Sequence, residues 1–485
     1  MKDGIITWDC KYEAEVMLIA YDIFLGGDNP MQAEECSHGG LHCNYMCRTC
    51  KEGGTNTEKI SEEGYSNLFK VCYNILLRVS TISLFIQSGE LRKPEETLAE
   101  INKQIELAKE SGGTEKIKKS VASSGIRDSL STPIINRLLE LGKKLRKRKA
   151  GVPSMPEADV RAQLEREFET ALGGHSLNSH INPLLQMPGV NIHQDTPTEI
   201  LHTVLLGIVK YFWGQTVYIL EKAHQLHLFQ ACLESVNKEG LKSPTLGAEY
   251  ICHYKGGLIG KHFKSLAQVM SYLVYDLVPK HVLDSWTVIG ELVVLLWHTC
   301  IENVEEYLVS LSILSSLLVL TYHQAKLTHA INNFLTLSAL CAPSILVTKA
   351  KFHFLVHLPA YIRRFGPAIL FSTERYESFN HVFRLSSIHS NRQAPSRDTC
   401  QSFADQDIVK HIVTGGYWYD EGVKRWVHAG KDISSYSNTH PEVCQFLGLP
   451  RSSEKPVGQS FQPFIHIITI NSPFIRLCTV TNNSR

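Results

Sequence analysis

The residues most able to do chemistry gather first in the stretch from Phe365 to Pro395, FGPAILFSTERYESFNHVFRLSSIHSNRQAP. Its spacing predicts a helix capped by Ser372 or Thr373, because about 100° per residue places Glu374 and the basic side chains on one side and the aromatic ones on the other. A surface helix with glutamates in its first turn accounts for this pattern. A helix that presents the Glu374 carboxylate to a divalent cation accounts for it as well.

A second stretch, CSHGGLHCNYMCRTC, crowds four cysteines between Cys36 and Cys50. Cys47 and Cys50 form a Cys-x-x-Cys pair, the usual knuckle for Zn²⁺. We expect a structural zinc whose other two ligands come from the same stretch, where the candidates are Cys36, His38, His42 and Cys43. The alternative is a set of reduced thiols in a small core.

Three further residues carry groups that suit a metal or a proton. Asp28, in the sequence DNP, follows an expected buried strand and a Gly-Gly turn, where α/β folds place metal-binding carboxylates, although aspartate also forms turns. Glu199 and His202 are three residues apart in an expected helix and so share a face. Such a pair is also typical of a helix cap next to a histidine at the edge of the core.

Positive charge is concentrated locally, in the run KKLRKRK from Lys143 to Lys149. Such a run is typical of a nuclear localisation signal, of a contact to the DNA backbone or of a solvated helix face. Its candidate DNA-binding residues are Lys143, Lys144, Arg146, Lys147 and Arg148. Lys261 and Lys264 add positive charge elsewhere in the chain.

The totals set the frame for these sites. With 485 residues, 43% of them hydrophobic, the chain is long enough for about two or three soluble domains. A net charge of +1 means that local basic patches would have to hold any nucleic acid. Thirteen cysteines without a secretory signal indicate the nucleus or the cytoplasm. The longest apolar stretch, Tyr307 to Tyr322, contains serines and predicts a buried helix rather than a membrane span.

The elements that must position these residues are mostly helical. We expect charged helices from residue 89 to 172, closed by Gly173 and Gly174, and a helix from about Thr198 whose apolar stripe runs from Leu201 to Val209. A short strand is expected at KFHFLVHLP, residues 351–359. Val71–Ser88, Leu311–Gln324 and the tail from about Pro456 differ in composition from their neighbours and are interpreted as insertions.

The fold class expected from this pass is α/β at the two ends of the chain, with a large, mostly helical insertion between them. The expected division is a strand-turn segment with the cysteine cluster, a charged helical region, a helical insertion, a part with the Glu374 helix, and an atypical tail; the ranges are 1–60, 89–175, 176–347, 348–445 and 446–485.

The order of these motifs resembles the catalytic domain of CACTA-type (En/Spm-like) DNA transposases, nearest to the fungal, basidiomycete branch of Plavaka and Kyakuja-Dileera-Zisupton elements. In that family a VHLP strand leads to a Gly-Pro turn, then ERY on a helix, then an Asn-Arg exit. The matching segments here are Val356–Pro359, Gly366-Pro367, Glu374–Tyr376 and Asn391-Arg392. The resemblance covers most of the chain from about residue 14 to 445, outside the insertions.

The resemblance implies a partial RNase H-like core and a DDE site. Glu374 would be its last acid and Asp28 its second, with the Cys-x-x-Cys pair at about the family's interval. His202 matches an Asp-x-x-His signature in which Glu199 stands where aspartate is usual. The segment GKHFKSLAQ is similar to the family's Lys-Ser-His segment.

The activity implied is Mg²⁺-dependent cleavage and transfer of DNA strands, with transposon ends as the partner. Asp28 and Glu374 would hold Mg²⁺, Glu199 and His202 would line the site, and phosphates would be contacted by Lys261, Lys264, Arg375 and Arg392. The first acid has no counterpart, because only 27 residues precede Asp28, too few for three leading strands. We therefore expect a truncated, inactive chain; the alternative is a non-enzymatic DNA- or protein-binding transposon remnant with a structural zinc.

Overall fold

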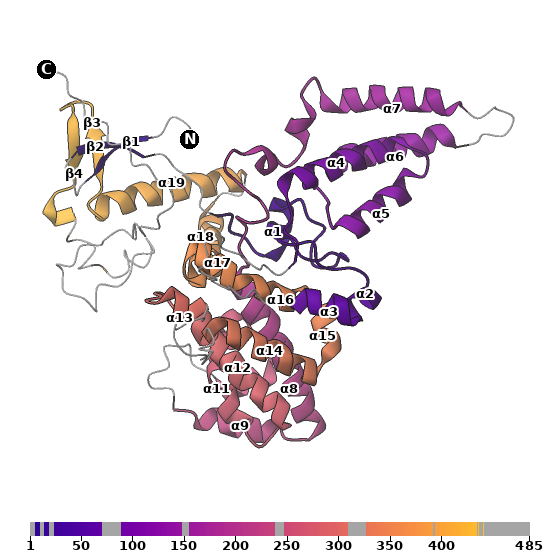
Figure 1. Ribbon diagram of the computed structural model, residues 1–485. Helices are drawn as coiled ribbons and strands as arrows, with labels where there is room; N and C mark the ends of the chain where they lie inside the picture. Colours follow the sequence, from indigo (N-terminus) through magenta and orange to yellow (C-terminus); the bar gives the residue numbers. More distant parts are fainter. Residues whose placement is uncertain are drawn as a thin grey trace, which may run out of the picture. The chain divides into compact units, whose positions relative to one another are not determined.

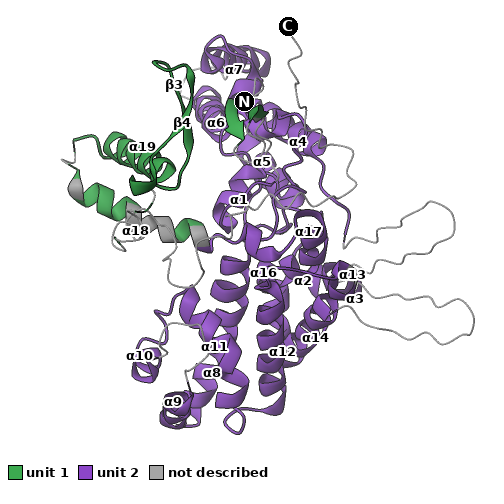
Figure 2. Ribbon diagram, turned by 90° about the vertical axis from the view of Figure 1, so that its left-hand side faces the viewer, with its two compact units in different colours: residues 1–21, 375–485 green, residues 22–374 purple. Residues whose placement is uncertain are grey.

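The computed structural model describes residues 5–9, 14–18, 24–69, 89–147, 155–237, 247–308, 326–390, 393–433, 435 and 440. The chain forms two compact units (Figure 2): residues 22–374, and residues 1–21 together with 375–485. The expected insertions at Val71–Ser88 and Leu311–Gln324 and the tail from Pro456 lie outside the described residues, as do Arg148 and Arg392.

The described residues are mostly helical (Figure 1), so the expected helical body is confirmed, whereas sheet is confined to two antiparallel hairpins. One hairpin pairs β1 (Ile5–Asp9) with β2 (Ala14–Leu18), and the other pairs β3 (Tyr417–Asp420) with β4 (Arg425–His428). The expected buried strand ahead of Asp28 is wrong. Residues 14–18 do form a strand, but Met17 is 47% exposed, and residues 24–28, directly ahead of the helix after Asp28, belong to no strand.

The unit of residues 1–21 and 375–485 combines both hairpins with α18 (Glu374–His389) and α19 (Pro395–Val413). The Trp8 ring of the first hairpin lies 6.4 Å from the Tyr417 ring and 6.5 Å from the Trp426 ring of the second. The helix expected from Glu374 is therefore present, and Glu374 N–H donates to the Ser372 hydroxyl at 3.3 Å, as its expected cap requires.

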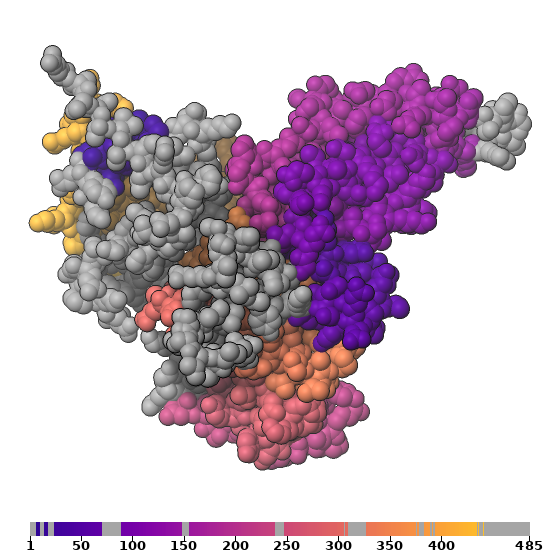
Figure 3. Space-filling view, in the orientation of Figure 1, coloured from indigo at the N-terminus to yellow at the C-terminus, as the bar shows by residue number. Residues whose placement is uncertain are grey.

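Within residues 22–374, the charged region expected from residue 89 to 172 forms helices whose buried apolar side chains make a core of their own. Figure 3 shows this part of the chain in purple and magenta. Its helices are α4 (Pro94–Lys109), α5 (Gly113–Ser124), α6 (Thr132–Arg146) and α7 (Glu157–Leu172). On α7, Val160, Leu164 and Phe168 recur every four residues and are buried, which is the periodicity of one helix face. Gly173 ends α7 in the left-handed conformation (φ 59°), as its sequence predicts.

The larger core belongs to the helices that follow. They are the π-helix η3 (Leu201–Val209), α8 (Lys210–Lys222), α9 (Leu226–Ser235), α10 (Ala248–His253), α11 (Gly260–Leu273), α12 (Lys280–Leu296), α13 (Val304–Leu308), α14 (Lys326–Cys341) and α15 (Pro343–Thr348). The apolar stripe expected from Leu201 to Val209 is buried, as predicted. In the described part of the chain, one helix, Leu201–Lys222, is long and apolar enough to cross a membrane, and 61% of that window is buried inside the protein, as in a core helix.

The segment expected as a strand at residues 351–359 is helical instead. It forms α16 (Ala350–Phe354), the 3₁₀ turn η4 (Leu355–His357) and the start of α17 (Leu358–Phe365), which the 3₁₀ turn η5 (Ala368–Phe371) follows. All side chains from Phe352 to Pro359 are buried. A short apolar run that is buried on every side carries no periodicity, so it does not distinguish helix from strand.

Short elements connect the two cores. They are α1 (Asn29–Glu35), α2 (Asn56–Ile60), α3 (Glu62–Phe69) and the 3₁₀ turns η1 (Leu177–His180) and η2 (Pro183–Gln186). The loop between α1 and α2 carries the cysteine cluster, and Met46, Cys47 and Cys50 pack with Leu68, Ala350 and Phe354 in a third small core. The cysteine cluster and α16 are therefore neighbours.

Candidate metal centre

Four buried side chains converge where the cysteine loop meets α16. They are Cys47, Cys50, His353 and His357, and their ligand atoms all lie within 4.8 Å of one another. The Cys47 sulfur is 3.3 Å from His357 Nε2, the Cys50 sulfur is 3.3 Å from His353 Nε2, and the two Nε2 atoms are 3.3 Å apart. Among the residues that the structure describes, this is the one group of three or more such side chains.

These distances fit a tetrahedral zinc ion. Zn–S bonds of about 2.3 Å and Zn–N bonds of about 2.0–2.1 Å put sulfur and nitrogen about 3.5 Å apart and the two nitrogens about 3.3 Å apart at the corners of a tetrahedron. Two thiolates and two imidazoles are also the donor set of structural zinc sites with no open position. The centre can therefore bind a metal such as zinc.

The residues around the centre orient its ligands. His353 Nδ1 donates to the Leu68 carbonyl at 2.6 Å, which leaves Nε2 as the ligand atom. The N–H groups of Thr49 and Cys50 lie 3.4 and 3.5 Å from the Cys47 sulfur, to which they donate. These bonds hold the knuckle in the conformation that binds a metal.

Arg92, which is 4% exposed, binds the backbone of the Cys47–Cys50 knuckle. Its Nε donates to the carbonyls of Cys47 at 2.8 Å and Cys50 at 3.0 Å, and its Nη1 donates to the Ser124 carbonyl at 2.7 Å. A buried guanidinium whose donors are used on backbone carbonyls fixes the loop without a carboxylate partner.

The proton equilibria of the four groups are linked. Burial opposes ionisation of Cys47, but hydrogen bonding to Cys50 and the nearby imidazoles outweigh it and hold the Cys47 pKa well below its usual value. Burial and the Cys47 thiolate raise the pKa of Cys50 well above its usual value. Burial lowers the pKa of His357, whereas at His353 burial is outweighed by the Cys47 thiolate and by hydrogen bonds, which raise the pKa.

The expectation for the remaining ligands was wrong. Cys36 is buried, and its S–H donates at 3.0 Å to the carbonyl of Ile192, which is 156 residues further along the chain. His38 Nε2 bonds the Tyr45 carbonyl at 2.8 Å, and the Cys43 sulfur lies 3.8 Å from that nitrogen. Side chains close together in the sequence are used here to fold the loop, whereas His353 and His357 complete the centre.

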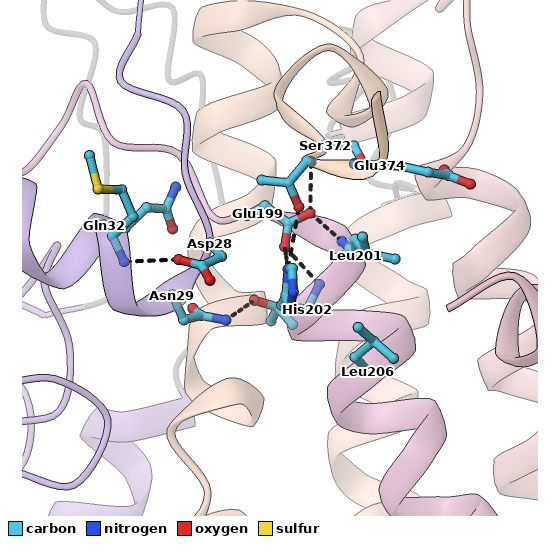
Figure 4. A network of polar contacts seen from close by, with 12 residues as sticks. Asp28, Asn29, Gln32, Glu199, Leu201, His202, Leu206, Ser372 and Glu374 are labelled. Atoms are coloured by element: carbon cyan, nitrogen blue, oxygen red, sulfur yellow. Dashed lines mark hydrogen bonds and ion pairs between the residues drawn. The ribbon is translucent and has the colours of Figure 1, made fainter. Parts of the chain in front are cut away.

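The Glu199–His202 pair lies at the start of η3, where it forms part of a hydrogen-bond network (Figure 4). The Glu199 carboxylate is fully buried and accepts from the N–H groups of Leu201 (2.6 Å), His202 (2.7 Å) and Thr373 (3.0 Å), and His202 Nδ1 lies 3.1 Å from it. Burial alone would raise the pKa of Glu199, but these hydrogen bonds outweigh burial and lower it. The carboxylate therefore anchors the first turn of the helix to the Ser372-Thr373 segment.

The π-helix that follows this anchor has a lysine bound against it. Lys351 Nζ donates to the His202 carbonyl at 2.7 Å and lies 3.4 Å from the Leu206 carbonyl. Gly207 makes room for it, because a Cβ there would lie 2.5 Å from Lys351 Cδ. The i→i+5 pattern of a π-helix is rare and often occurs at functional sites.

Asp28 and Glu374 have separate partners. Asp28 caps α1 by accepting from the Met31 N–H at 2.9 Å. The Glu374 carboxylate lies 3.3 Å from Lys264 Nζ and 3.3 Å from Trp297 Nε1, and Figure 4 shows it pointing away from Asp28 and Glu199. These acids form no three-membered cluster among the described residues, so their arrangement does not fit a site of two Mg²⁺ ions.

The basic run has both structural and exposed members. Arg146 bonds Glu157 and donates to the Lys109 carbonyl at 2.8 Å, so it joins α6 to its neighbours. Lys143, Lys144 and Lys147 are exposed at the end of α6, and Lys261 is exposed at the start of α11. Arg375 is the second residue of α18.

The missed ligands left one signal in the sequence. His353 and His357 have the His-x₃-His spacing, which places both on one face of a helix, and Cys-x₂-Cys with His-x₃-₅-His is a recognised zinc pattern. The signal is visible only if residues 353–357 are read as a helix. Comparison of the chain with models of known protein families, with curated proteins and with solved structures yields no match.

Proposed function

We propose that the chain is a transposon-derived protein of DDE-transposase ancestry that binds DNA, holds one structural Zn²⁺ and does not cleave DNA. The observation that carries this proposal is the Cys₂His₂ centre. Three of its four ligands lie in motifs on which the resemblance rests: Cys47 and Cys50 in Cys-x-x-Cys, and His357 in the VHLP segment. They meet at a metal-binding geometry although Cys50 and His353 are 303 residues apart.

The lack of cleavage follows from the partners of the candidate acids. Lys264 and Trp297 contact the Glu374 carboxylate, which points away from Glu199, and four donors occupy the buried Glu199 carboxylate. Mg²⁺ binds through carboxylates and several retained waters, which need accessible oxygens grouped around one point. These carboxylates therefore do not form a Mg²⁺ site. The RNase H-like core remains part of the proposed ancestry and rests on the resemblance.

DNA binding would be electrostatic and would use the end of α6. Lys143, Lys144 and Lys147 are exposed there, and lysines contact phosphates whatever the base sequence. The same exposed run would suit nuclear import, which makes the nucleus the proposed location.

The test uses the full chain and a labelled DNA duplex. We expect salt-dependent binding and no Mg²⁺-dependent strand cleavage. Replacing Lys143, Lys144 and Lys147 by alanine should lower the slope of log affinity against log salt by up to about three, since each phosphate contact contributes about 0.9. The matched control replaces Lys116 and Lys118, whose ammonium groups form ion pairs with Glu110 and Glu115.

Two outcomes would overturn the proposal. A chain that does not bind DNA at low salt is not a DNA-binding protein. Mg²⁺-dependent cleavage that Glu374→Gln abolishes would show an active nuclease and would remove the proposed loss of catalysis.

A further inference from the structure

An exposed group of aromatic rings covers the junction of α10 and α11. Tyr250 is 46% exposed and Tyr254 is 54% exposed, and their ring centroids lie 4.9 Å apart. The Tyr250 ring is 5.4 Å from the His262 ring, and the His253 ring is 4.6 Å from the Tyr254 ring. Four rings therefore form one outward-facing surface, which we call the ring platform.

The platform is built on a rigid base. Cys252 and Ile251 are buried on the other side of α10, and Trp213 Nε1 donates to the Lys255 carbonyl at 2.9 Å, which ties the following turn to the core. The Ile259 N–H lies 3.3 Å from His262 Nδ1 and so orients that ring. The helices that carry the platform are therefore fixed to the core.

The charges beside the platform are positive. Lys261 is exposed in the first turn of α11, next to His262, and α11 contains no acidic residue. The first N–H groups of a 14-residue helix add partial positive charge at the same end. Lys255 forms an ion pair with Glu221, and Glu249 is exposed on α10, so the positive field is concentrated at the α11 side.

The turn between the helices leaves space for a chain to approach. Gly256 has no atom within 4 Å of the position where a Cβ would lie, and Gly257 meets only the Tyr254 carbonyl, at 3.6 Å. Exposed rings next to a cation and an open backbone are the combination that binds single-stranded nucleic acid, because bases stack on the rings while the phosphates lie along the positive groups. Paired bases in a duplex do not offer their faces in this way.

We propose that the ring platform binds unpaired nucleotides of single-stranded nucleic acid, with bases stacking on Tyr250 and Tyr254 and a phosphate held by Lys261. This goes beyond the proposed function, which needs only contacts to duplex backbone, and rests on it only in taking nucleic acid as the ligand.

The experiment measures fluorescence anisotropy of a labelled oligothymidylate of about 20 nucleotides with the full chain. Loss of one stacking ring is worth about five- to 150-fold in affinity, from about 1–3 kcal/mol per base. We expect Tyr250→Ala and Tyr254→Ala each to weaken binding within that range, and Tyr250→Phe to stay within about twofold because it keeps the ring.

The matched control is a pair of tyrosines at and just beyond the other end of α11, outside the platform. Tyr272 and Tyr275 are 81% and 73% exposed, and their replacement by alanine should leave binding unchanged. Circular dichroism of each variant checks that it folds, as the exposure of the tyrosines leads us to expect.

The outcomes separate the two proposals. If Tyr250→Ala and Tyr254→Ala bind oligothymidylate as the wild type does, or no worse than the Tyr272 and Tyr275 variants, the platform is not a stacking surface. Duplex binding through the end of α6 with no single-strand binding would overturn this inference alone. Absence of binding to either nucleic acid would overturn both.

Discussion

His353→Ala is the substitution that most directly tests the metal centre. It removes one of four ligands and also the donor to the Leu68 carbonyl. Structural zinc binding is worth about 10–16 kcal/mol with four ligands, or about 2.5–4 kcal/mol for each if shared equally. The variant should therefore bind zinc about 10²–10³-fold more weakly than the wild type.

The control comes from the cysteine cluster itself. Cys43→Ser changes a thiol four residues from Cys47 that bonds the Gly40 and Tyr45 carbonyls and lies outside the four-ligand group. A serine hydroxyl can donate to either of the same carbonyls, so this variant should keep its zinc. The pair of variants therefore distinguishes the ligand set of the structure from the one that the local sequence suggests.

The assay is zinc content after gel filtration against a competing chelator, together with the absorption of the Co²⁺-substituted protein. Wild type and Cys43→Ser should each hold one equivalent and show the strong visible bands of tetrahedral cobalt with two thiolates, and His353→Ala should lose both signals. If His353→Ala keeps its zinc while Cys43→Ser loses it, the assignment of the histidines is wrong. If no protein holds zinc, the centre is not a zinc site.

Three further substitutions test the electrostatics of two glutamates and the packing of the π-helix. Burial raises the pKa of Glu35 to about 6, so the ionised carboxylate destabilises the folded chain at pH 7. Glu35→Gln removes that charge and should raise the free energy of unfolding by about 1 kcal/mol at pH 7, after a discount for partial exposure. At pH 4, where the carboxyl is protonated in both the folded and the unfolded chain, urea titrations should show no such gain. Because hydrogen bonds lower the pKa of Glu199, its ionised carboxylate stabilises the folded chain fully above its usual pKa, and this stabilisation is lost as the pH falls through the lowered value. In urea titrations, the destabilisation caused by Glu199→Gln should therefore shrink below about pH 4.5. Gly207→Ala should cost about 1–3 kcal/mol because its Cβ would press on Lys351, whereas Gly214→Ala, with open space around it, should be neutral or stabilising by up to about 1 kcal/mol; equal effects of the two would contradict the close packing described at Gly207.

The sequence predicted the elements whose local pattern carries the information. The end of α7 at Gly173, the start of α18 after Ser372 and the buried stripe of η3 all follow from caps and from a 3.6-residue period. Each is decided by residues a few positions apart. For α7 and η3, burial in the core favours the same helix that the local pattern predicts.

The parts that the sequence did not predict depend on distant residues. His353 is helical because it packs at the centre of the core, and nothing within residues 351–359 distinguishes that environment from a strand in a sheet. The two halves of the metal centre are separated by 303 residues, whereas the sequence near Cys47 predicts Cys36, His38 and Cys43 as ligands. Proximity in sequence favours the wrong ligands because the true ones are brought in by folding.

The centre should be preformed rather than assembled by the metal. Closing a loop of about 300 residues costs about 5 kcal/mol in its length-dependent term. Contacts independent of zinc already hold this loop closed, since the Thr49 hydroxyl lies 2.7 Å from the Tyr361 hydroxyl and the Arg48 guanidinium lies 4.7 Å from the centre of the Phe354 ring. Removing zinc with a chelator should therefore lower the melting temperature while the far-ultraviolet helical signal at 25 °C is retained. A metal that is 1,000-fold above its dissociation constant contributes about 4 kcal/mol to stability, and at the same zinc concentration the 10²–10³-fold weaker affinity of His353→Ala should leave only about 0.4–1.4 kcal/mol of it. Complete loss of the helical signal on chelation would show that the metal, and not these contacts, closes the loop.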